Sequence, residues 1–299
     1  MARQPVIRKN HPDFLDKLLP DLTLDFRHTT KNLELRNGIW YSKNATEVSF
    51  PEDGYDRCYQ VEENSFWFKH RNNCIIETVK QFTPNGVIFD IGGGNGYVAS
   101  GLEKASLETV LVEPGKEGVL NAKKRGLTNI VCSTLEDMQL NNESADAMGI
   151  FDVLEHIEDD FSFLKTLNKF LKNGGMLYIT VPAFQFLWSR EDVAAGHFRR
   201  YSLKTLEKVL NKAGFEKVYS TYIFSVAPVP VLLLRVLPSW LGLYKNPQDV
   251  AHQQQVHASK KGITDSVLEK IWKWELEKIK NKEMISTGGS CLFVARKKQ

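Results

Sequence analysis

Four of the five residues 92–96 are glycine, and they follow directly after the apolar run 87–91, which contains one carboxylate, Asp90. Backbone at a strand-to-helix turn approaches a ligand closely only where the Cβ atom is missing, and the N-terminus of the following helix favours electronegative groups. The loop is therefore expected to hold a nucleotide-like cofactor, and the neighbouring residues must decide which one.

The glycine spacing permits two classes of cofactor. Gly94, Gly96 and Ala99 satisfy the relaxed pattern G-x-G-x-x-A of dinucleotide-binding proteins, so an NAD(P)-dependent oxidoreductase stays open as an alternative. Asp90 favours S-adenosylmethionine instead, because a carboxylate at this position accepts the ammonium group of that cofactor and repels a pyrophosphate. Glu113 ends the next apolar run and can accept both hydroxyls of a ribose, which suits either class.

The pattern D-x-G-x-G-x-G over 90–96 resembles the first motif of the class I S-adenosylmethionine-dependent methyltransferases. The resemblance continues through "FDVLEH" and "LKNGGMLYITVP" and covers about residues 66–215. It implies an α/β fold, a doubly wound, seven-stranded Rossmann-like sheet with strand order 3-2-1-4-5-7-6 and an antiparallel strand 7, an N-terminal lid and a C-terminal insertion. It also implies methyl transfer from S-adenosylmethionine. A protein that binds the cofactor without turnover is a further alternative.

The segment "GHFRRYSLKTLEKVLNKAGF", residues 196–215, resembles the subgroup that methylates small molecules, lipids or sugars. An acceptor of this kind is what the resemblance implies, and it leaves open whether oxygen, nitrogen or carbon receives the methyl group.

The resemblance also implies which residues hold the cofactor. They are Asp90, Gly92, Gly94, Gly96, Glu113, Pro114, Thr134, Leu135, Phe151, Trp67 and Arg71. Thr134 stands where many relatives carry an acid that binds the adenine amino group, and Glu136 is the alternative for this role. Trp67 and Arg71 lie on one face of a predicted helix over 64–82 and are expected to act as a lid, with core packing of the aromatic residues as the alternative.

Two histidines are candidate catalytic bases. Methyl transfer from a sulfonium needs close alignment of the reactants, and a base only where the nucleophile must lose a proton. His156 follows the predicted strand 145–151, and His197 lies in the loop beyond the predicted strand 175–181. The alternative for His156 is that it orients the loop by hydrogen bonding.

The loop around His197 is expected to bind the acceptor. Its candidate residues are Trp188, Asp192, Arg199, Arg200 and Tyr201. Convergent arginines could clamp an anionic group such as a carboxylate or phosphate. The alternative is a solvated loop in which Arg199 or Arg200 pairs with Glu191 or Asp192.

Short apolar runs alternate with segments of helical periodicity, which predicts a parallel sheet with crossover helices. Strands are expected at 87–91, 109–113, 129–133, 145–151, 175–181, 216–224 and 290–296. Residues 1–63 are expected to form an N-terminal extension. The methyltransferase domain is expected over 64–299, with the lid helix 64–82, a core over 87–224, an apolar insertion and helix over 225–285, and the last strand over 290–296.

Composition excludes several classes of protein. The 299 residues, 42% of them hydrophobic, can build one large core, and a net charge of +3 with scattered Lys and Arg does not favour nucleic-acid binding. The four cysteines show no paired spacing, and no cluster of metal ligands is evident in the sequence, so no metal is expected. The N-terminus has no apolar signal segment, which favours a cytoplasmic location.

An apolar segment over 222–244 carries a single charge, Arg235, but Pro228, Pro230 and Pro238 interrupt it. A membrane-spanning helix needs about 20 continuous apolar residues, so the segment is expected to be a buried or interfacial insertion. It is expected to cover an apolar or lipid-linked acceptor or to contact a membrane surface. Packing in the core or in a homodimer is the alternative.

Overall fold

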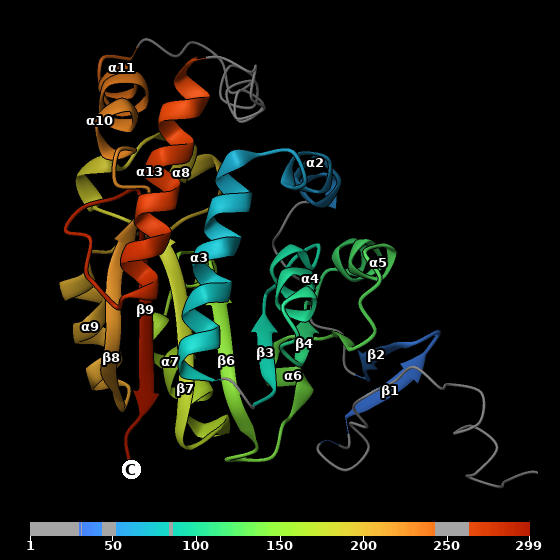
Figure 1. Cartoon of the computed structure of the whole chain (residues 1–299). Helices are drawn as coiled ribbons and strands as arrows, with labels where there is room; N and C mark the ends of the chain where they lie inside the picture. Colours follow the sequence, from blue (N-terminus) through green and yellow to red (C-terminus); the bar gives the residue numbers. More distant parts are fainter. Residues whose placement is uncertain (1–29, 31, 44–51, 84–85, 243–262) are drawn as a thin grey trace, which may run out of the picture.

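The computed structural model describes residues 30, 32–43, 52–83, 86–242 and 263–299. In this part of the chain, nine strands form one sheet in the order β1-β2-β5-β4-β3-β6-β7-β9-β8 (Figure 1). The strands are β1 Leu33–Arg36, β2 Ile39–Ser42, β3 Ile88–Ile91, β4 Thr109–Val112, β5 Ile130–Cys132, β6 Ala145–Phe151, β7 Leu171–Pro182, β8 Phe215–Ile223 and β9 Ser290–Lys297.

Helices pack on both faces of this sheet. The main ones are α2 Glu52–Glu62, α3 Phe66–Phe82, α4 Tyr97–Lys104, α5 Lys116–Lys124, α6 Leu135–Met138, α7 Asp160–Phe170, α8 Arg190–Ala194, α9 Leu203–Lys212, α10 Pro228–Val231, α11 Leu237–Trp240 and α13 Ile263–Lys280. Figure 1 shows α3 and α13 in front of the strands and α7 behind them. The sheet is thus covered on both sides, as a doubly wound fold requires.

The buried strands explain why the centre of this sheet is parallel. Every residue of β3, β4 and β5 is buried, which is the pattern of strands covered on both faces. One apolar layer joins Ile75 and Val79 of α3 to Val98 of α4. Another layer joins residues of α7 and α9, including Leu164 and Leu206.

The sheet has more strands than the seven that the sequence predicts, so that count is wrong. The N-terminal hairpin β1–β2 extends the edge, with Trp40 of β2 in parallel register with Val131 of β5. Leu33, Ile39 and Trp40 are buried, which explains why this short hairpin joins the sheet. The other seven strands lie in the order β5-β4-β3-β6-β7-β9-β8, and β9 is antiparallel to both of its neighbours.

The predicted apolar insertion is described only in part, because residues 243–262 lie outside the described residues. Its first half forms α10, a π-helical turn over Leu232–Val236 and α11, and several large apolar side chains there are exposed. Among the helices that the structure describes, none combines the length and the apolar character needed to cross a bilayer.

Candidate functional site

The candidate site lies at the carboxyl ends of the central parallel strands. β3 pairs with β4 on one side and with β6 on the other, so the chain order of the strands reverses at β3. Open α/β sheets bind their ligands in the crevice at such a switch point. The glycine loop follows β3, Glu113 follows β4 and His156 follows β6, so the topology brings three of the predicted segments to one edge.

The glycine loop connects β3 to α4 through backbone that favours glycine. Gly92, Gly94 and Gly96 have φ angles of 69°, 55° and 71°. A Cβ atom on Gly96 would lie 2.5 Å from the Leu127 side chain, so glycine here permits close packing. A Cβ atom on Gly94 would meet no heavy atom of the described residues within 4 Å, so this part of the loop faces open space.

Asp90 is completely buried directly before this loop. Neither of its carboxylate oxygens has a hydrogen-bond partner among the described residues. Burial raises the pKa of Asp90 to about 7, although the nearby Arg71 guanidinium lowers it. A buried carboxylate without a donor is unfavourable unless a ligand supplies one, so Asp90 is suited to bind a cationic group.

Glu113 follows β4 and is almost fully buried beside the loop. Its Oε2 accepts the Gly94 N–H (2.8 Å), and its Oε1 accepts the Gly115 N–H (2.7 Å) and the Tyr55 O–H (2.8 Å). Burial raises the pKa of Glu113, although these hydrogen bonds each lower it. The carboxylate is therefore held in a fixed orientation at the position predicted to accept ribose hydroxyls.

Tyr55 is a site residue that the sequence does not predict. It comes from α2, and its ring packs against Gly115 and Gly118, where added Cβ atoms would collide with it. The only signal in the sequence is an aromatic residue in a charged segment, and nothing there connects it to Glu113.

The two predicted lid residues, Trp67 and Arg71, contact different parts of the structure. Arg71 forms an ion pair with Asp152, which follows β6 directly and has a φ of 58°, a conformation uncommon outside glycine. Asp152 also accepts the Thr180 hydroxyl (2.9 Å). Trp67 instead stacks on Phe224, at 3.4 Å between ring centroids. Arg71 thus lies at the strand ends, and the predicted role of Trp67 toward the cofactor stays a prediction.

The remaining predicted cofactor residues are placed as follows. Thr134 caps α6, because its Oγ1 accepts the Asp137 N–H (3.0 Å). Leu135 and Phe151 are buried in the apolar core, and the Pro114 carbonyl accepts a weak bond from a cysteine thiol. Their contacts with an adenine or ribose ring stay predictions.

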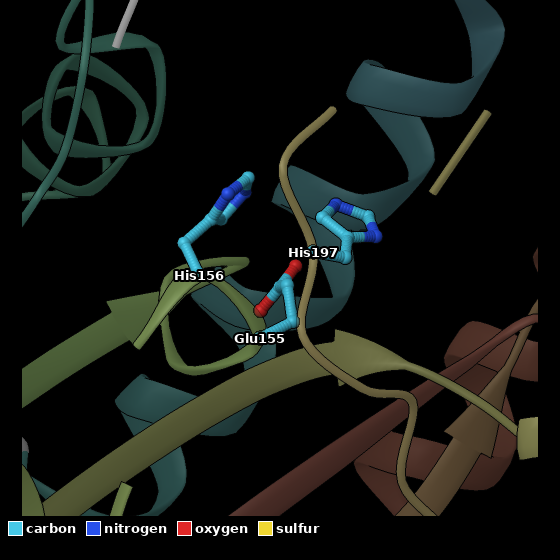
Figure 2. A group of neighbouring side chains, drawn as sticks. All are labelled: Glu155, His156 and His197. Carbon is cyan, nitrogen blue, oxygen red and sulfur yellow. The ribbon is translucent and has the colours of Figure 1, made fainter. Parts of the chain in front are cut away.

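On the acceptor side, the fold brings together Glu155, His156 and His197. One potential ligand atom from each lies within 4.8 Å of the other two. The two imidazole rings meet edge to face, with centroids 4.7 Å apart. Figure 2 shows the Glu155 carboxylate between the imidazoles. The Phe198 N–H donates to the Glu155 carbonyl (2.7 Å), which fixes the loop that carries His197 against the turn after β6.

Asp192 orients His197. Its Oδ1 accepts from His197 Nδ1 (2.9 Å) and Arg200 Nε (2.7 Å), and its Oδ2 accepts the Ser189 N–H (2.9 Å). Burial alone would raise the pKa of Asp192, but the His197 and Arg200 hydrogen bonds outweigh it and hold that pKa below its usual value. Because a carboxylate only accepts, His197 Nδ1 carries a proton, and Nε2 is the atom available to the site.

The pKa values of the other two groups of this cluster are both shifted toward the uncharged form. Burial, together with the neighbouring His197, lowers the pKa of His156 to about 4. Burial raises the pKa of Glu155 to about 8, and its Oε2 has no hydrogen-bond partner among the described residues. The cluster therefore offers a neutral His156 imidazole beside a carboxyl group of which one oxygen has no partner among the described residues.

The arginines predicted to clamp an anion are engaged within the chain. Arg199 donates to the carbonyls of Ile157 (2.8 Å) and Glu158 (2.6 Å), and Arg200 donates to Asp192 and to the Ala183 carbonyl (3.2 Å). The Tyr201 hydroxyl donates to Asp160 (2.7 Å), and Trp188 is half-buried beside this loop. These contacts hold the loop in place, and acceptor binding by these residues stays a prediction.

Comparisons with known proteins agree with this arrangement. A family model described as a methyltransferase domain matches residues 67–220. A probable S-adenosylmethionine-dependent methyltransferase of Mycolicibacterium smegmatis is 22% identical over 176 residues, which cover 58% of this chain and 68% of that protein. A ubiquinone biosynthesis O-methyltransferase of Aliivibrio fischeri is 28% identical over 147 residues, which cover 46% of this chain and 62% of that protein.

Solved structures share the fold. An S-adenosylmethionine-dependent methyltransferase from Thermotoga maritima superposes with a TM-score of 0.52 at 20% identity, covering 82% of this chain and 96% of that one. Phosphoethanolamine N-methyltransferase 2 from Haemonchus contortus, in complex with S-adenosylmethionine, superposes with a TM-score of 0.53 at 18% identity. The superposition covers 87% of this chain and 62% of that one. At these identities the likeness shows the Rossmann-like α/β fold alone.

Proposed function

The chain belongs to the family of methyltransferase domains, and on that premise we propose that it transfers the methyl group of S-adenosylmethionine to a small-molecule or lipid-linked acceptor at the carboxyl ends of β6 and β7. The relatives support an acceptor of this size. One is named for ubiquinone biosynthesis, and a structural neighbour is named for phosphoethanolamine. They differ in whether oxygen or nitrogen is methylated, so the proposal is limited to the class of acceptor.

The observation that carries the proposal is the buried Asp90 beside the glycine loop, whose two carboxylate oxygens have no partner in the part of the chain that the structure describes. An ammonium group would supply the donors that these oxygens lack, whereas a pyrophosphate would add negative charge next to them. Glu113 would accept the ribose hydroxyls in place of the Tyr55 hydroxyl. The residues therefore fit S-adenosylmethionine better than a nicotinamide dinucleotide. When bound, the cofactor supplies a methyl group activated by its sulfonium.

The chain's own residues contribute position and proton transfer. The glycine loop and Glu113 hold one reactant, and the turn and loop that carry His156 and His197 border the other. We infer that the acceptor's nucleophilic atom loses its proton beside these two imidazoles. His156 is neutral at physiological pH, and Asp192 directs His197 Nε2 toward the same space.

The exposed apolar segment supports a lipid-linked acceptor. Leu233, Trp240 and Leu241 are 54%, 66% and 72% exposed. Arg235, in the same segment, forms an ion pair with Glu191 (2.6 Å), which neighbours Asp192 in the acceptor loop. A lipid surface is thus proposed to lie close to the acceptor site. Co-sedimentation of the protein with lipid vesicles tests this proximity to a lipid surface. The Leu233→Asp variant should co-sediment less than the wild type. A concentration-dependent dimer that Leu233→Asp dissociates, without vesicle binding, would favour the homodimer alternative.

Calorimetric titration of the full chain tests the cofactor. S-adenosylhomocysteine is expected to bind with one site per chain, and NADH is expected not to bind. Binding of NADH without S-adenosylhomocysteine would restore the oxidoreductase alternative. Release of S-adenosylhomocysteine is then followed with a panel of catechols, quinols and phosphorylated amines. Cofactor binding without release for any of these would favour a binding protein without turnover.

A further inference from the structure

We propose that Glu155, His156 and His197 bind a divalent first-row transition-metal cation, such as zinc, at the acceptor end of the site. The sequence predicts no metal site, because these three residues come from a turn after β6 and from a loop far along the chain. Binding of the cation stands on the geometry alone. Only its role in the reaction depends on the proposed methyl transfer.

The spacing of the three side chains suits a single cation. Their ligand atoms lie within 4.8 Å of one another. Zinc binds imidazole nitrogen and carboxylate oxygen at about 2.0–2.2 Å, which places tetrahedral ligands about 3.4 Å apart. The widest pair must therefore approach by at most about 1.4 Å, which a rotation of the half-buried His156 side chain can supply.

His197 is prepared as a ligand by Asp192. Histidines that bind metals usually donate their other ring N–H to a carboxylate, which fixes the ring and its tautomer. The Nδ1 of His197 makes this bond to Asp192 at 2.9 Å, and Nε2 points toward His156 in Figure 2. Asp192 is itself fixed by hydrogen bonds from Arg200 and Ser189, so the orientation of the His197 imidazole is fixed on its Nδ1 side.

Glu155 provides an independent observation. Its side chain is 1% exposed, and among the described residues its Oε2 has no hydrogen-bond partner. The nearby guanidinium groups pair with other carboxylates, Arg71 with Asp152 and Arg200 with Asp192. Figure 2 shows the Glu155 carboxylate directed into the space between the imidazoles. A cation there would satisfy an oxygen that the described part of the chain leaves without a partner.

The donor set favours a transition metal over magnesium or calcium. Two imidazoles and one carboxylate suit zinc or iron, whereas magnesium and calcium prefer oxygen ligands. Three protein ligands leave a position open, as in catalytic zinc sites. An acceptor hydroxyl at that position would have a lowered pKa and would release its proton to solvent. The methyl carbon would then form its bond to that oxygen as its bond to sulfur breaks. With the cation bound, the histidines would serve as ligands, and the proton would go to solvent instead of to an imidazole.

The test is a titration of the full chain, freed of metal with a chelator, with Zn²⁺ by calorimetry and with Co²⁺ by visible absorption. One high-affinity equivalent is expected, with the absorption of a four- or five-coordinate Co²⁺, and much weaker binding of Mg²⁺. Loss of a single outer partner of a metal ligand usually weakens binding about 10- to 100-fold, so His197→Ala and Glu155→Gln should each weaken it by about 100-fold or more. Glu158→Gln is the matched control, because it removes an exposed carboxylate three residues along the chain from Glu155 that is not one of the three ligands, and it should leave the affinity unchanged.

Absence of a high-affinity equivalent would overturn the proposal, as would equal affinities of the wild type and of all three ligand variants, including His156→Ala. Circular dichroism identifies any variant that does not fold. The metal affinities of the folded ligand variants then show whether these residues bind the cation. The same metal-free protein is titrated with S-adenosylhomocysteine. If that ligand binds and the cation does not, only the metal site is wrong. If the cation binds and S-adenosylhomocysteine does not, the proposed methyl transfer is wrong.

Discussion

Asp90 and Asp192 are both buried aspartates, one in the cofactor half of the site and one in the acceptor half, yet their surroundings are opposite. Asp90 has no hydrogen-bond partner among the described residues, whereas Asp192 accepts bonds from Ser189, His197 and Arg200. Burial raises the pKa of Asp90 to about 7, and the bonds to Asp192 hold its pKa below the usual value. Asp90 is therefore available to a ligand, whereas Asp192 fixes the loop in which it lies.

The largest effect is expected from Asp192→Ala. The substitution leaves the Arg200 guanidinium, only 12% exposed, without its carboxylate. Breaking a buried ion pair by removing one partner costs about 3–5 kcal/mol of folding stability. Urea denaturation measures this loss. Glu207→Ala is the control, because its ion pair with Lys217 is solvent-exposed and should contribute less than about 1 kcal/mol. Equal losses for the two variants would show that Asp192 does not hold the loop.

Asp90→Asn is expected to weaken cofactor binding without a loss of folding stability, the opposite of the effect predicted for Asp192→Ala. Removing a buried carboxylate that has no donor among the residues described should leave the folding stability unchanged or raise it. A hydrogen bond to a charged group contributes about 1.5–3 kcal/mol, so affinity for S-adenosylhomocysteine should fall by about 10- to 150-fold. Asp146→Asn, at the opposite end of β6, serves as the control in the same titration. Unchanged affinity with a folded Asp90→Asn protein would contradict the role of Asp90 as the ammonium-binding group.

This contrast explains why the cofactor half is predictable from the sequence. Asp90, the glycines and the start of α4 follow one another along the chain, and Glu113 ends the next strand. Their relative positions are fixed by a single strand–loop–helix unit, so a local pattern is sufficient. The buried strands are predictable for the same reason, because short apolar runs suit strands covered on both faces.

The acceptor half depends instead on contacts between distant segments. Contacts such as the Phe198 N–H to the Glu155 carbonyl and Asp192 to the His197 ring bring Glu155 and His197 together. The sequence shows the right residue types in this loop and leaves two alternatives open, an anion clamp or pairing within the loop, and the structure has the Arg200–Asp192 pair of the second. The pairing of the β1–β2 hairpin with the sheet and the role of Tyr55 do not follow from the sequence for a similar reason, since each is placed by partners elsewhere in the fold.

The pKa of Asp90 predicts how cofactor affinity depends on pH. A bound ammonium favours the ionised carboxylate, so the pKa of Asp90 is lower in the complex than the value of about 7 in the free protein. Binding then releases a proton below pH 7, and affinity for S-adenosylhomocysteine should fall about tenfold for each pH unit below 7. Calorimetry in buffers of different ionisation enthalpy measures the proton released.

Two variants sharpen this pH test. Asp90→Asn should give a flat profile, because it has no carboxyl group to protonate. Arg71→Ala should move the midpoint to higher pH, because the Arg71 guanidinium lowers the Asp90 pKa in the wild type. A wild-type affinity that stays constant from pH 8 to pH 6 would mean that Asp90 does not bind the ammonium group.

The smallest effect is expected from Tyr55→Phe. The Tyr55 hydroxyl donates to Glu113 Oε1, the atom proposed to accept a ribose hydroxyl, so the two donors would compete. A hydrogen bond of this kind contributes about 0.5–1.5 kcal/mol net, and its removal should tighten S-adenosylhomocysteine binding by about two- to tenfold. Tyr59→Phe, on the same helix with its ring against Arg125, is the control. Weaker binding by Tyr55→Phe would instead show that the hydroxyl keeps a partner in the complex, so that α2 closes over the cofactor and does not compete with it.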